Sequence, residues 1–289
     1  MAQELITPIP QTVVYDHAKA ALGKKLFFDT RLSLDNTISC ASCHILSDGG
    51  DDNLPLSFGI KGQKGAVNAP TVLNAVFNFR QFWDGRAADL QEQAAGPIEN
   101  PVEMGYSFDA LIKRLQKTDY KKQFAAIYED GITKESITDA IAEYEKSLFT
   151  PNAPFDRYLR GEEDALTTEQ KEGYELFKSK GCIACHQGVN IGGNMYNKFG
   201  VFTESNSSNL GRYSVTHKEQ DKYYFKVPTL RNIAQTAPYF HDARTSSLSV
   251  AVLLMAQYQL GRKITPQEVK KIVAFLHTLS APNLQSIGE

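Results

Sequence analysis

Apolar residues recur at three- and four-residue steps over much of the chain, which is the spacing of amphipathic helices. Alternating strand patterns are scarce. Thr167-Thr168-Glu169-Gln170 has the form of a capping box and predicts a helix whose apolar face includes Gly173, Leu176 and Phe177. The pattern therefore predicts an all-α fold. Further helices are indicated by four apolar sets: Phe108, Leu111, Ile112 and Leu115; Ile137, Ala140, Ile141, Tyr144 and Leu148; Leu248, Val252, Leu253 and Met255; and Val269, Ile272, Val273, Phe275 and Leu276.

Short sequences recur in the two halves of the chain in the same order. Cys40-Ala41-Ser42-Cys43-His44 matches Cys182-Ile183-Ala184-Cys185-His186, and 142 positions separate the two histidines. Residues 22–27, before the first motif, resemble residues 172–177, before the second. This self-similarity predicts that one structural unit has been duplicated.

Downstream of these motifs the two copies keep a constant offset of 158 positions. Pro70-Thr71 corresponds to Pro228-Thr229, Asn74 corresponds to Asn232, and the segment 82–86 corresponds to 240–244. The second copy therefore carries 16 extra residues, and the Gly-, Asn- and Ser-rich segment 188–211 is where they are expected.

Length and composition agree with two globular domains. The chain has 289 residues, against about 150 for a typical domain. Pro151 and Pro154 punctuate a linker, so the predicted domains are 1–160 and 161–289, with roughly the first 15 residues available to pack on the other domain. A net charge of −2 gives no support to a nucleic-acid partner, and no apolar run approaches the ~18 residues of a membrane span.

The four cysteines all belong to the two Cys-x-x-Cys-His motifs, the attachment signature of c-type haem. Two thiols three positions apart can each form a thioether with a haem vinyl group, and the next residue carries an imidazole to the iron. A redox dithiol or a Cys₄ zinc site is the alternative, but neither needs a histidine after each pair. The motifs predict two covalently bound haem c groups on Cys40, Cys43, Cys182 and Cys185, with His44 and His186 as iron ligands.

Covalent haem attachment also bears on location. The bacterial attachment machinery works outside the cytoplasm, so a periplasmic protein is expected. Residues 1–4 form neither a basic n-region nor an apolar h-region, so the sequence as given predicts no signal peptide.

The two copies differ in the residue expected to bind the iron on the side opposite the motif histidine. Met255 follows His186 by 69 positions and is the expected sixth ligand of the second haem, where methionine favours electron transfer. At the 158 offset Met255 corresponds to Pro97, which cannot bind iron. The iron of the second haem is therefore predicted to have both protein ligands and to transfer electrons. The iron of the first haem is predicted to keep one position at which a small molecule can bind.

These residues resemble the bacterial dihaem cytochrome c peroxidases over nearly the whole chain. The resemblance rests on Gln81–Arg86, Gly96-Pro97, Val102–Gly105 and Tyr239–His241 together with the two haem motifs. It implies two cytochrome c-like haem domains in tandem and an oxidoreductase that reduces hydrogen peroxide to water. Electrons from a small donor, such as a cytochrome c or a copper protein, enter at the C-terminal haem and pass to the N-terminal peroxidatic haem.

The resemblance also assigns roles to particular residues. Glu103 is the expected acid–base residue and Gln93 orients the peroxide. Trp83 matches the tryptophan between the haems, and His241 is expected to contact the surroundings of the second haem without binding its iron. The other three histidines, His17, His217 and His277, are interpreted as ordinary surface or partly buried residues.

A calcium ion between the domains and a homodimer are implied by the same resemblance. Asn68, Thr236 and Pro238 match positions near that ion, where amide and backbone oxygens suit a hard cation.

One departure concerns the loop after the first motif. Many family members keep a histidine there that binds the peroxidatic iron in the resting enzyme, whereas this chain has Ile60. The first haem is then expected to be five-coordinate or water-bound at rest, unless Met104, Lys61 or Lys64 supplies the ligand.

Two other functional classes remain open at this stage. A plain dihaem electron carrier would need both irons six-coordinate, which Ile60 and Pro97 disfavour. A relative that oxidises a protein residue, of the methylamine-dehydrogenase maturation type, would have tyrosine in place of Met255.

Overall fold

The computed structural model describes residues 4–204, 206–284 and 287. The fold is predominantly helical, as predicted, and each capping box or periodic segment named above begins or lies within a helix. The helices are α1 (His17–Phe27), α2 (Cys40–Cys43), α3 (Leu90–Glu99), α4 (Phe108–Leu115), α5 (Tyr120–Ala125), α6 (Lys134–Ser147), α7 (Pro154–Leu159), α8 (Thr168–Lys180), α9 (Tyr213–Thr216), α10 (Leu248–Leu260) and α11 (Pro266–His277), and the strands are β1 (Tyr196–Lys198) and β2 (Tyr224–Lys226).

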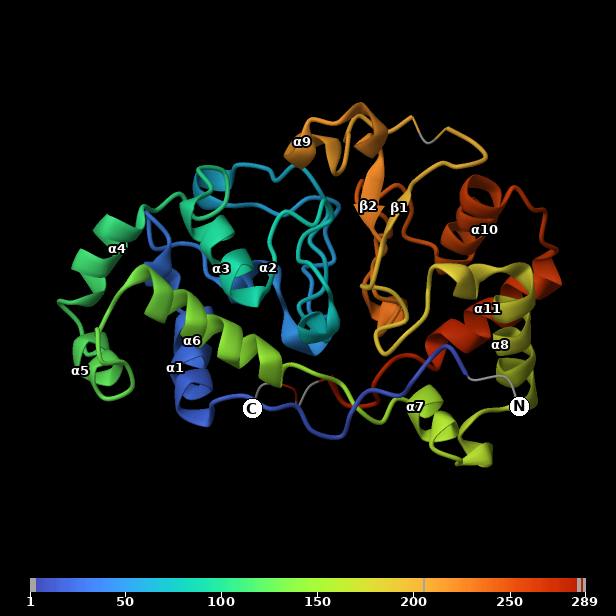
Figure 1. Cartoon of the computed structure of the whole chain (residues 1–289), viewed down its shortest axis with the longest axis horizontal. Helices are drawn as coiled ribbons and strands as arrows, with labels where there is room; N and C mark the ends of the chain where they lie inside the picture. Colours follow the sequence, from blue (N-terminus) through green and yellow to red (C-terminus); the bar gives the residue numbers. More distant parts are fainter. Residues whose placement is uncertain (1–3, 205, 285–286, 288–289) are drawn as a thin grey trace.

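The helices form two units that lie side by side (Figure 1). In the first unit, α1, α3, α4, α5 and α6 surround one apolar cluster that includes Leu26, Leu111 and Ile137. In the second unit, α8 and α11 carry a separate cluster that includes Phe177 and Phe275. Each unit therefore has its own core, which agrees with a duplicated domain.

The main helix pair of each unit crosses at a glycine. A methyl group at Gly23 of α1 would lie 1.8 Å from the carbonyl oxygen of Ala140 on α6. A methyl group at Gly173 of α8 would lie 2.0 Å from that of Lys271 on α11. Only glycine lets the helix backbones approach so closely, and the two glycines occupy matching places in the repeat.

The 158-residue offset is visible in the backbone. Helix α3 begins at Leu90 and α10 at Leu248, and an isolated bridge closes the preceding loop in both copies, between Gln81 and Ala87 and between Tyr239 and Thr245. The extra residues of the second copy lie around the short antiparallel pair β1–β2, in which Asn197 faces Phe225. This pair is the only regular sheet among the described residues.

The two ends of the chain cross to the opposite unit (Figure 1). Ile6 near the N-terminus is buried in the cluster of the second unit with Phe155 and Phe275. Ala281 and Leu284 near the C-terminus are buried with Phe27 and Leu73 of the first unit. The described part of the N-terminal segment thus lies where it was expected to lie, whereas the reciprocal crossing of the C-terminal segment was not predicted.

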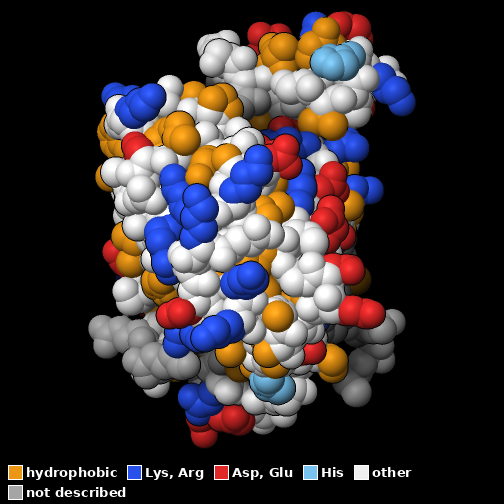
Figure 2. Space-filling view, turned by 90° about the vertical axis from the view of Figure 1, so that its left-hand side faces the viewer, with side chains coloured by type: hydrophobic (Ala, Val, Ile, Leu, Met, Phe, Trp, Pro, Cys, Tyr) orange, Lys and Arg blue, Asp and Glu red, His pale blue; other side chains and the backbone are white. Residues whose placement is uncertain are grey.

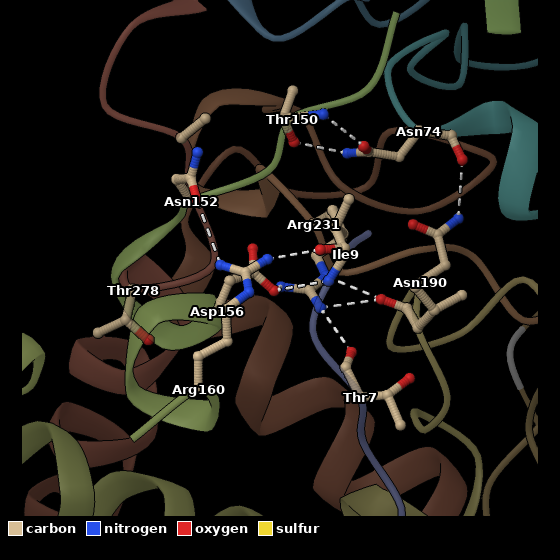
Figure 3. A network of polar contacts seen from close by, with 12 residues as sticks. Thr7, Ile9, Asn74, Thr150, Asn152, Asp156, Arg160, Asn190, Arg231 and Thr278 are labelled. Carbon is tan, nitrogen blue, oxygen red and sulfur yellow. Dashed lines mark hydrogen bonds and ion pairs between the residues drawn. The ribbon is translucent and has the colours of Figure 1, made fainter. Parts of the chain in front are cut away.

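A buried ion pair lies where the N-terminal segment, α7 and the second unit meet (Figure 3). Arg231 Nη1 is 2.8 Å from Asp156 Oδ1, and both side chains have no exposed surface. The N–H group of Ile9 donates to the same carboxylate oxygen at 3.0 Å, and Arg231 Nη2 donates to the carbonyl oxygen of Thr7 at 3.2 Å. Arg160 Nη2 completes the contact by donating to the carbonyl oxygen of Ile9 at 2.6 Å.

The linker is held symmetrically by the two copies. Asn74 Nδ2 and Asn232 Nδ2 donate to the same Thr150 hydroxyl, at 2.8 and 3.2 Å. Both asparagines have left-handed backbone, with φ of 61° and 59°, a conformation that asparagine tolerates better than most residues. The repeat therefore places two equivalent side chains around one linker residue.

The segment after Pro151, which the sequence predicted as a linker, contains the helix α7. Pro154 is the first residue of α7, where proline is favoured, and Phe155 packs with the second unit. The division into 1–160 and 161–289 stays a prediction, and the packing of Phe155 favours a boundary before α7.

Charged side chains of both signs share the surface at the end of the first unit, with Lys and Arg along the middle of the view and Asp and Glu toward its right edge (Figure 2). Among the described residues, none of the helices combines the length and the apolar character that a membrane crossing requires.

We expect Asp156→Ala to lower the free energy of unfolding by about 3–5 kcal/mol, because it leaves the buried Arg231 guanidinium without its counter-charge. Chemical denaturation of the holoprotein measures the change. The control Glu163→Ala removes an exposed partner of Lys171 and should cost about 0–1 kcal/mol. Equal losses of unfolding free energy in the two variants would show that the buried pair stabilises the protein no more than an exposed one.

Candidate functional site

The two Cys-x-x-Cys-His motifs occupy matching positions after α1 and α8. Cys40 and Cys43 bound the short helix α2, while Cys182 begins a single 3₁₀ turn. All four cysteines are free thiols. Burial raises the pKa of Cys43 and of Cys182 to about 11, so neither resembles the acidic thiol of a redox pair. Within the described part of the chain no three His, Cys, Asp or Glu side chains gather as a metal site, so the zinc alternative lacks its ligand set.

Each motif histidine is oriented by a backbone carbonyl. His44 Nδ1 lies 3.0 Å from the oxygen of Gly50, and His186 Nδ1 lies 3.3 Å from that of Ile191. A carbonyl only accepts, so Nδ1 carries the proton and Nε2 is left as the metal-binding nitrogen. Burial lowers the pKa of both rings, that of His186 to about 4, which keeps them in the neutral form that binds iron.

One large cavity opens beside the second motif. Cys182, Cys185 and His186 line it on one side, and Met255 from α10 lines it as well. Much of the remaining lining is apolar: Phe177, Leu248, Ala251, Val252, Ile272 and Leu276. An apolar cavity that carries two thiols, an imidazole and a thioether fits a covalently attached haem with His and Met ligands.

The helix that carries Met255 has a counterpart in the first unit without a ligand. Pro97 occupies the matching position on α3, near the end of that helix. Pro97 has no donor atom on its side chain, which is consistent with the predicted inequality of the two sites.

Glu103 and Gln93 come from α3 and the turn that follows it. Asn100 Nδ2 donates to Glu103 Oε1 at 2.7 Å and thereby fixes the carboxylate. Burial raises the pKa of Glu103. The hydrogen bond from Asn100 and the positive charge of Arg86 act in the opposite direction, but the pKa stays above its usual value. The carboxylate is close enough to Cys43 to contribute, after burial, to the raised pKa of that thiol. The structure therefore places Glu103 beside the first haem motif.

The loop around Ile60 packs directly on the Glu103 turn. Ile60 is buried, and its N–H group donates to the carbonyl oxygen of Glu103 at 2.8 Å. Of the three replacement ligands, Met104 is 2% exposed within the apolar cluster of the first unit, while Lys61 and Lys64 are exposed at the surface. This arrangement favours the first haem without a protein ligand above the iron.

Trp83 lies between the two units. Its Nε1 donates to the carbonyl oxygen of Asn68 at 2.9 Å, and its ring centroid is 6.1 Å from that of His241. His241 is stacked on Phe225 and its Nε2 is 2.8 Å from the Ser207 hydroxyl. Both side chains line the cavity of the second motif, and His241 is placed as a neighbour of the haem site, as predicted.

The three residues expected near calcium come together. Asn68, Thr236 and Pro238 line the same cavity, and the Asn68 N–H group donates to the carbonyl oxygen of His241. Both carboxylate oxygens of Asp51 and Oε1 of Gln235 are buried close by with no hydrogen-bond donor. A group of oxygen acceptors without donors fits a hard cation.

Three buried ionisable residues around the sites were missed from the sequence. They are Asp51, Glu145, which burial gives a raised pKa of about 8, and Lys226. Glu145 and Lys226 each have an apolar or aromatic neighbour, and Asp51 lies between Gly50 and Asp52, so the local pattern does not mark their burial. The single available signal was their position inside otherwise buried segments next to a motif.

Comparison with known proteins finds similarity over nearly the whole chain. A family model described as di-haem cytochrome c peroxidase matches residues 17–164, and one described as cytochrome c matches residues 170–280. The cytochrome c peroxidase Ccp of Escherichia coli (strain K12) is 50% identical over 96% of this chain and 61% of its own length. The chain thus spans about three fifths of that relative.

Two further proteins match nearly the whole chain. The cytochrome c551 peroxidase of Nitrosomonas europaea is 49% identical over 96% of this chain and 85% of its own length. The crystal structure of a MauG-like protein associated with microbial copper homeostasis superposes with a TM-score of 0.84 at 26% identity, covering 98% of this chain and 95% of the other.

In the fully oxidised holoprotein we expect a high-spin signal from one of the two haems, because only the second site has a sixth protein ligand. Met255→Ala should convert the other haem to high spin as well. Electron paramagnetic resonance and visible absorption measure both. Leu253→Ala, an exposed neighbour on α10, is the control. Two low-spin haems in the unaltered protein would mean that Met104 or a lysine binds the first iron.

Proposed function

Since the chain belongs to the bacterial dihaem cytochrome c peroxidase family, we propose that it reduces hydrogen peroxide to water with electrons from a small donor protein. The observation that carries the proposal is the inequality of two equivalent sites. Met255 lines the second cavity, whereas Pro97 replaces it in the first unit, where the buried Glu103 lies beside the haem motif.

Haem groups held by His186 and Met255 and by His44 would supply the redox chemistry, the former site for electron entry and the latter for peroxide. The protein residues prepare these two sites for different tasks. Gly50 and Ile191 hold the imidazoles in the metal-binding tautomer.

Glu103 is proposed to move the proton during peroxide cleavage. It takes the proton of the oxygen nearer the haem and returns it to the departing hydroxide, which requires an ionised carboxylate at the start. The Asn100 amide holds Glu103 Oε1 in place, and Gln93 donates a hydrogen bond that orients the peroxide. Glu103 is partly buried, and this burial raises its pKa.

Trp83 is proposed to lie on the electron route. It contacts the first unit through Asn68 and the second through the ring of His241, and no other tryptophan is present in the sequence. Trp83 meets the ring of His241 edge-on and His241 stacks on Phe225, which gives the route a compact aromatic path from the first unit to the cavity of the second motif.

A calcium ion is proposed at Asn68, Thr236 and Pro238. It would offset the buried acceptor oxygens of Asp51 and Gln235 and bind two segments from different units. We further propose a periplasmic location, a small cytochrome c or copper protein as the donor, and a homodimer, in accordance with the family resemblance.

Glu103→Gln should lower turnover of peroxide by about 10²–10⁴-fold, because an amide cannot accept the proton. Peroxide-dependent oxidation of reduced cytochrome c measures the rate. The pKa of Glu103 is raised, so in the unaltered protein activity should fall on the acid side as the pH drops through that raised pKa and the carboxylate becomes protonated. This acid limb should be absent from the residual activity of the variant.

The matched control is Glu99→Gln, an exposed carboxylate on α3 paired with Lys134. Its activity and pH profile should equal those of the unaltered protein. Full turnover in Glu103→Gln would remove that residue from the mechanism.

Calcium removal by a chelator should lower the thermal midpoint of the holoprotein, since an ion at 100 times its dissociation constant stabilises by about 2.7 kcal/mol. Asn68→Ala should abolish this response. Asn194→Ala, an exposed asparagine in the second unit, should keep it. A midpoint that is unaffected by calcium in the unaltered protein would contradict the proposed ion.

A further inference from the structure

Lys226 is a buried cation without an anion. It is the last residue of β2, and its side chain is 6% exposed. Among the described residues no carboxylate pairs with its ammonium group, and burial alone lowers its pKa to about 8. Burying an unpaired ammonium group is costly, so its position calls for a partner.

The side chain of Lys226 lines the cavity of the second haem motif. The same cavity is lined by Cys182, Cys185, His186 and Met255. Much of the remaining wall is apolar, and no aspartate or glutamate of the described residues lines it. The anion that meets Lys226 must therefore come with whatever fills the cavity.

We propose that the Lys226 ammonium group binds a propionate carboxylate of the haem attached to Cys182 and Cys185. Haem c carries two propionates, and an ammonium–carboxylate pair satisfies both charges once the cavity is filled. The inference rests on the proposed electron-entry role of this haem and assigns a residue that orients and tunes it.

The backbone of Lys226 also connects the proposed propionate contact to Trp83. Its N–H group donates to the carbonyl oxygen of Trp83 at 2.8 Å. The residue that binds the haem edge is thus hydrogen-bonded to the residue proposed to carry electrons to the first unit. Lys226 is therefore a positioning residue for electron transfer.

A second lysine at the cavity provides an internal contrast. Lys180 also lines it, but its ammonium group already pairs with Glu268 and is partly exposed. Its charge is neutralised by the protein, whereas that of Lys226 is not. Substituting each lysine in turn separates a specific propionate contact from a general effect of positive charge.

A positive charge at the haem edge stabilises the reduced state, which carries one more electron. Lys226→Met should therefore shift the equilibrium of the Met-ligated haem about tenfold toward the oxidised state, equivalent to ~59 mV for one electron. Lys226→Arg should retain most of the original potential. Lys180→Met should shift the equilibrium less than about threefold, because it removes a charge that is already paired and partly solvated.

Spectroelectrochemical titration of the holoprotein, with haem content checked in every variant, measures these potentials. An unchanged potential in Lys226→Met, or an equal shift in Lys180→Met, overturns the proposal. Loss of the low-spin spectrum in Lys226→Met also overturns it, because the amine would then be an iron ligand. Should Lys226→Met fail to fold, Lys226→Gln serves in its place.

The proposed function is tested separately by peroxide turnover of the unaltered protein. If that protein does not reduce peroxide, the function fails while the potential shift still decides the role of Lys226. If turnover is present and the potential of the variant is unchanged, the Lys226 inference alone fails.

Discussion

The ion pair between Arg231 and Asp156 fixes the N-terminal segment and α7 against the second unit. Neither side chain has any exposed surface, and each charge is satisfied only because the other is present. Asp156 comes from α7 and Arg231 follows the second Pro-Thr motif, while the carbonyl oxygens of Thr7 and Val189 accept from Arg231 and the N–H group of Ile9 donates to Asp156. Three segments distant in sequence are thereby fixed at one point. Trp83 contacts the second unit separately, through the ring of His241 and the backbone of Lys226.

The local part of the fold could be predicted because helices and haem motifs have short-range signatures. The capping box at Thr167 and the periodicity of residues 137–148 both predicted helices that the structure contains. The structure shows that Leu90 and Leu248, which differ by the repeat offset of 158, begin equivalent helices, but the helix at Leu90 was not predicted. Family resemblance then supplied Glu103, Gln93 and Trp83, which neither periodicity nor spacing could single out.

The remaining features depend on contacts between distant residues. Strands of three residues such as β1 and β2 are too short to show alternation, so the pair was not predicted. Arg231 and Asp156 lie 75 positions apart and carry no mutual signal in one sequence. Lys226 is flanked by apolar residues and resembles a charged residue at the solvent face of a strand until its burial is known. Burial of a charge is a property of the assembled fold.

The crossed ends have a consequence for what happens when the chain is cut. Each terminal segment is buried in the unit that lies on the far side of the linker, Ile6 in one direction and Leu284 in the other. A protease that cleaves the backbone between Thr150 and Ala153 would produce two fragments. Each fragment would still have its terminal segment buried in the other. Such a nicked molecule should migrate as one particle until denaturant is added, and the two halves should reconstitute one another when mixed. The exchanged terminal segments thus hold the two units together without a covalent cross-link.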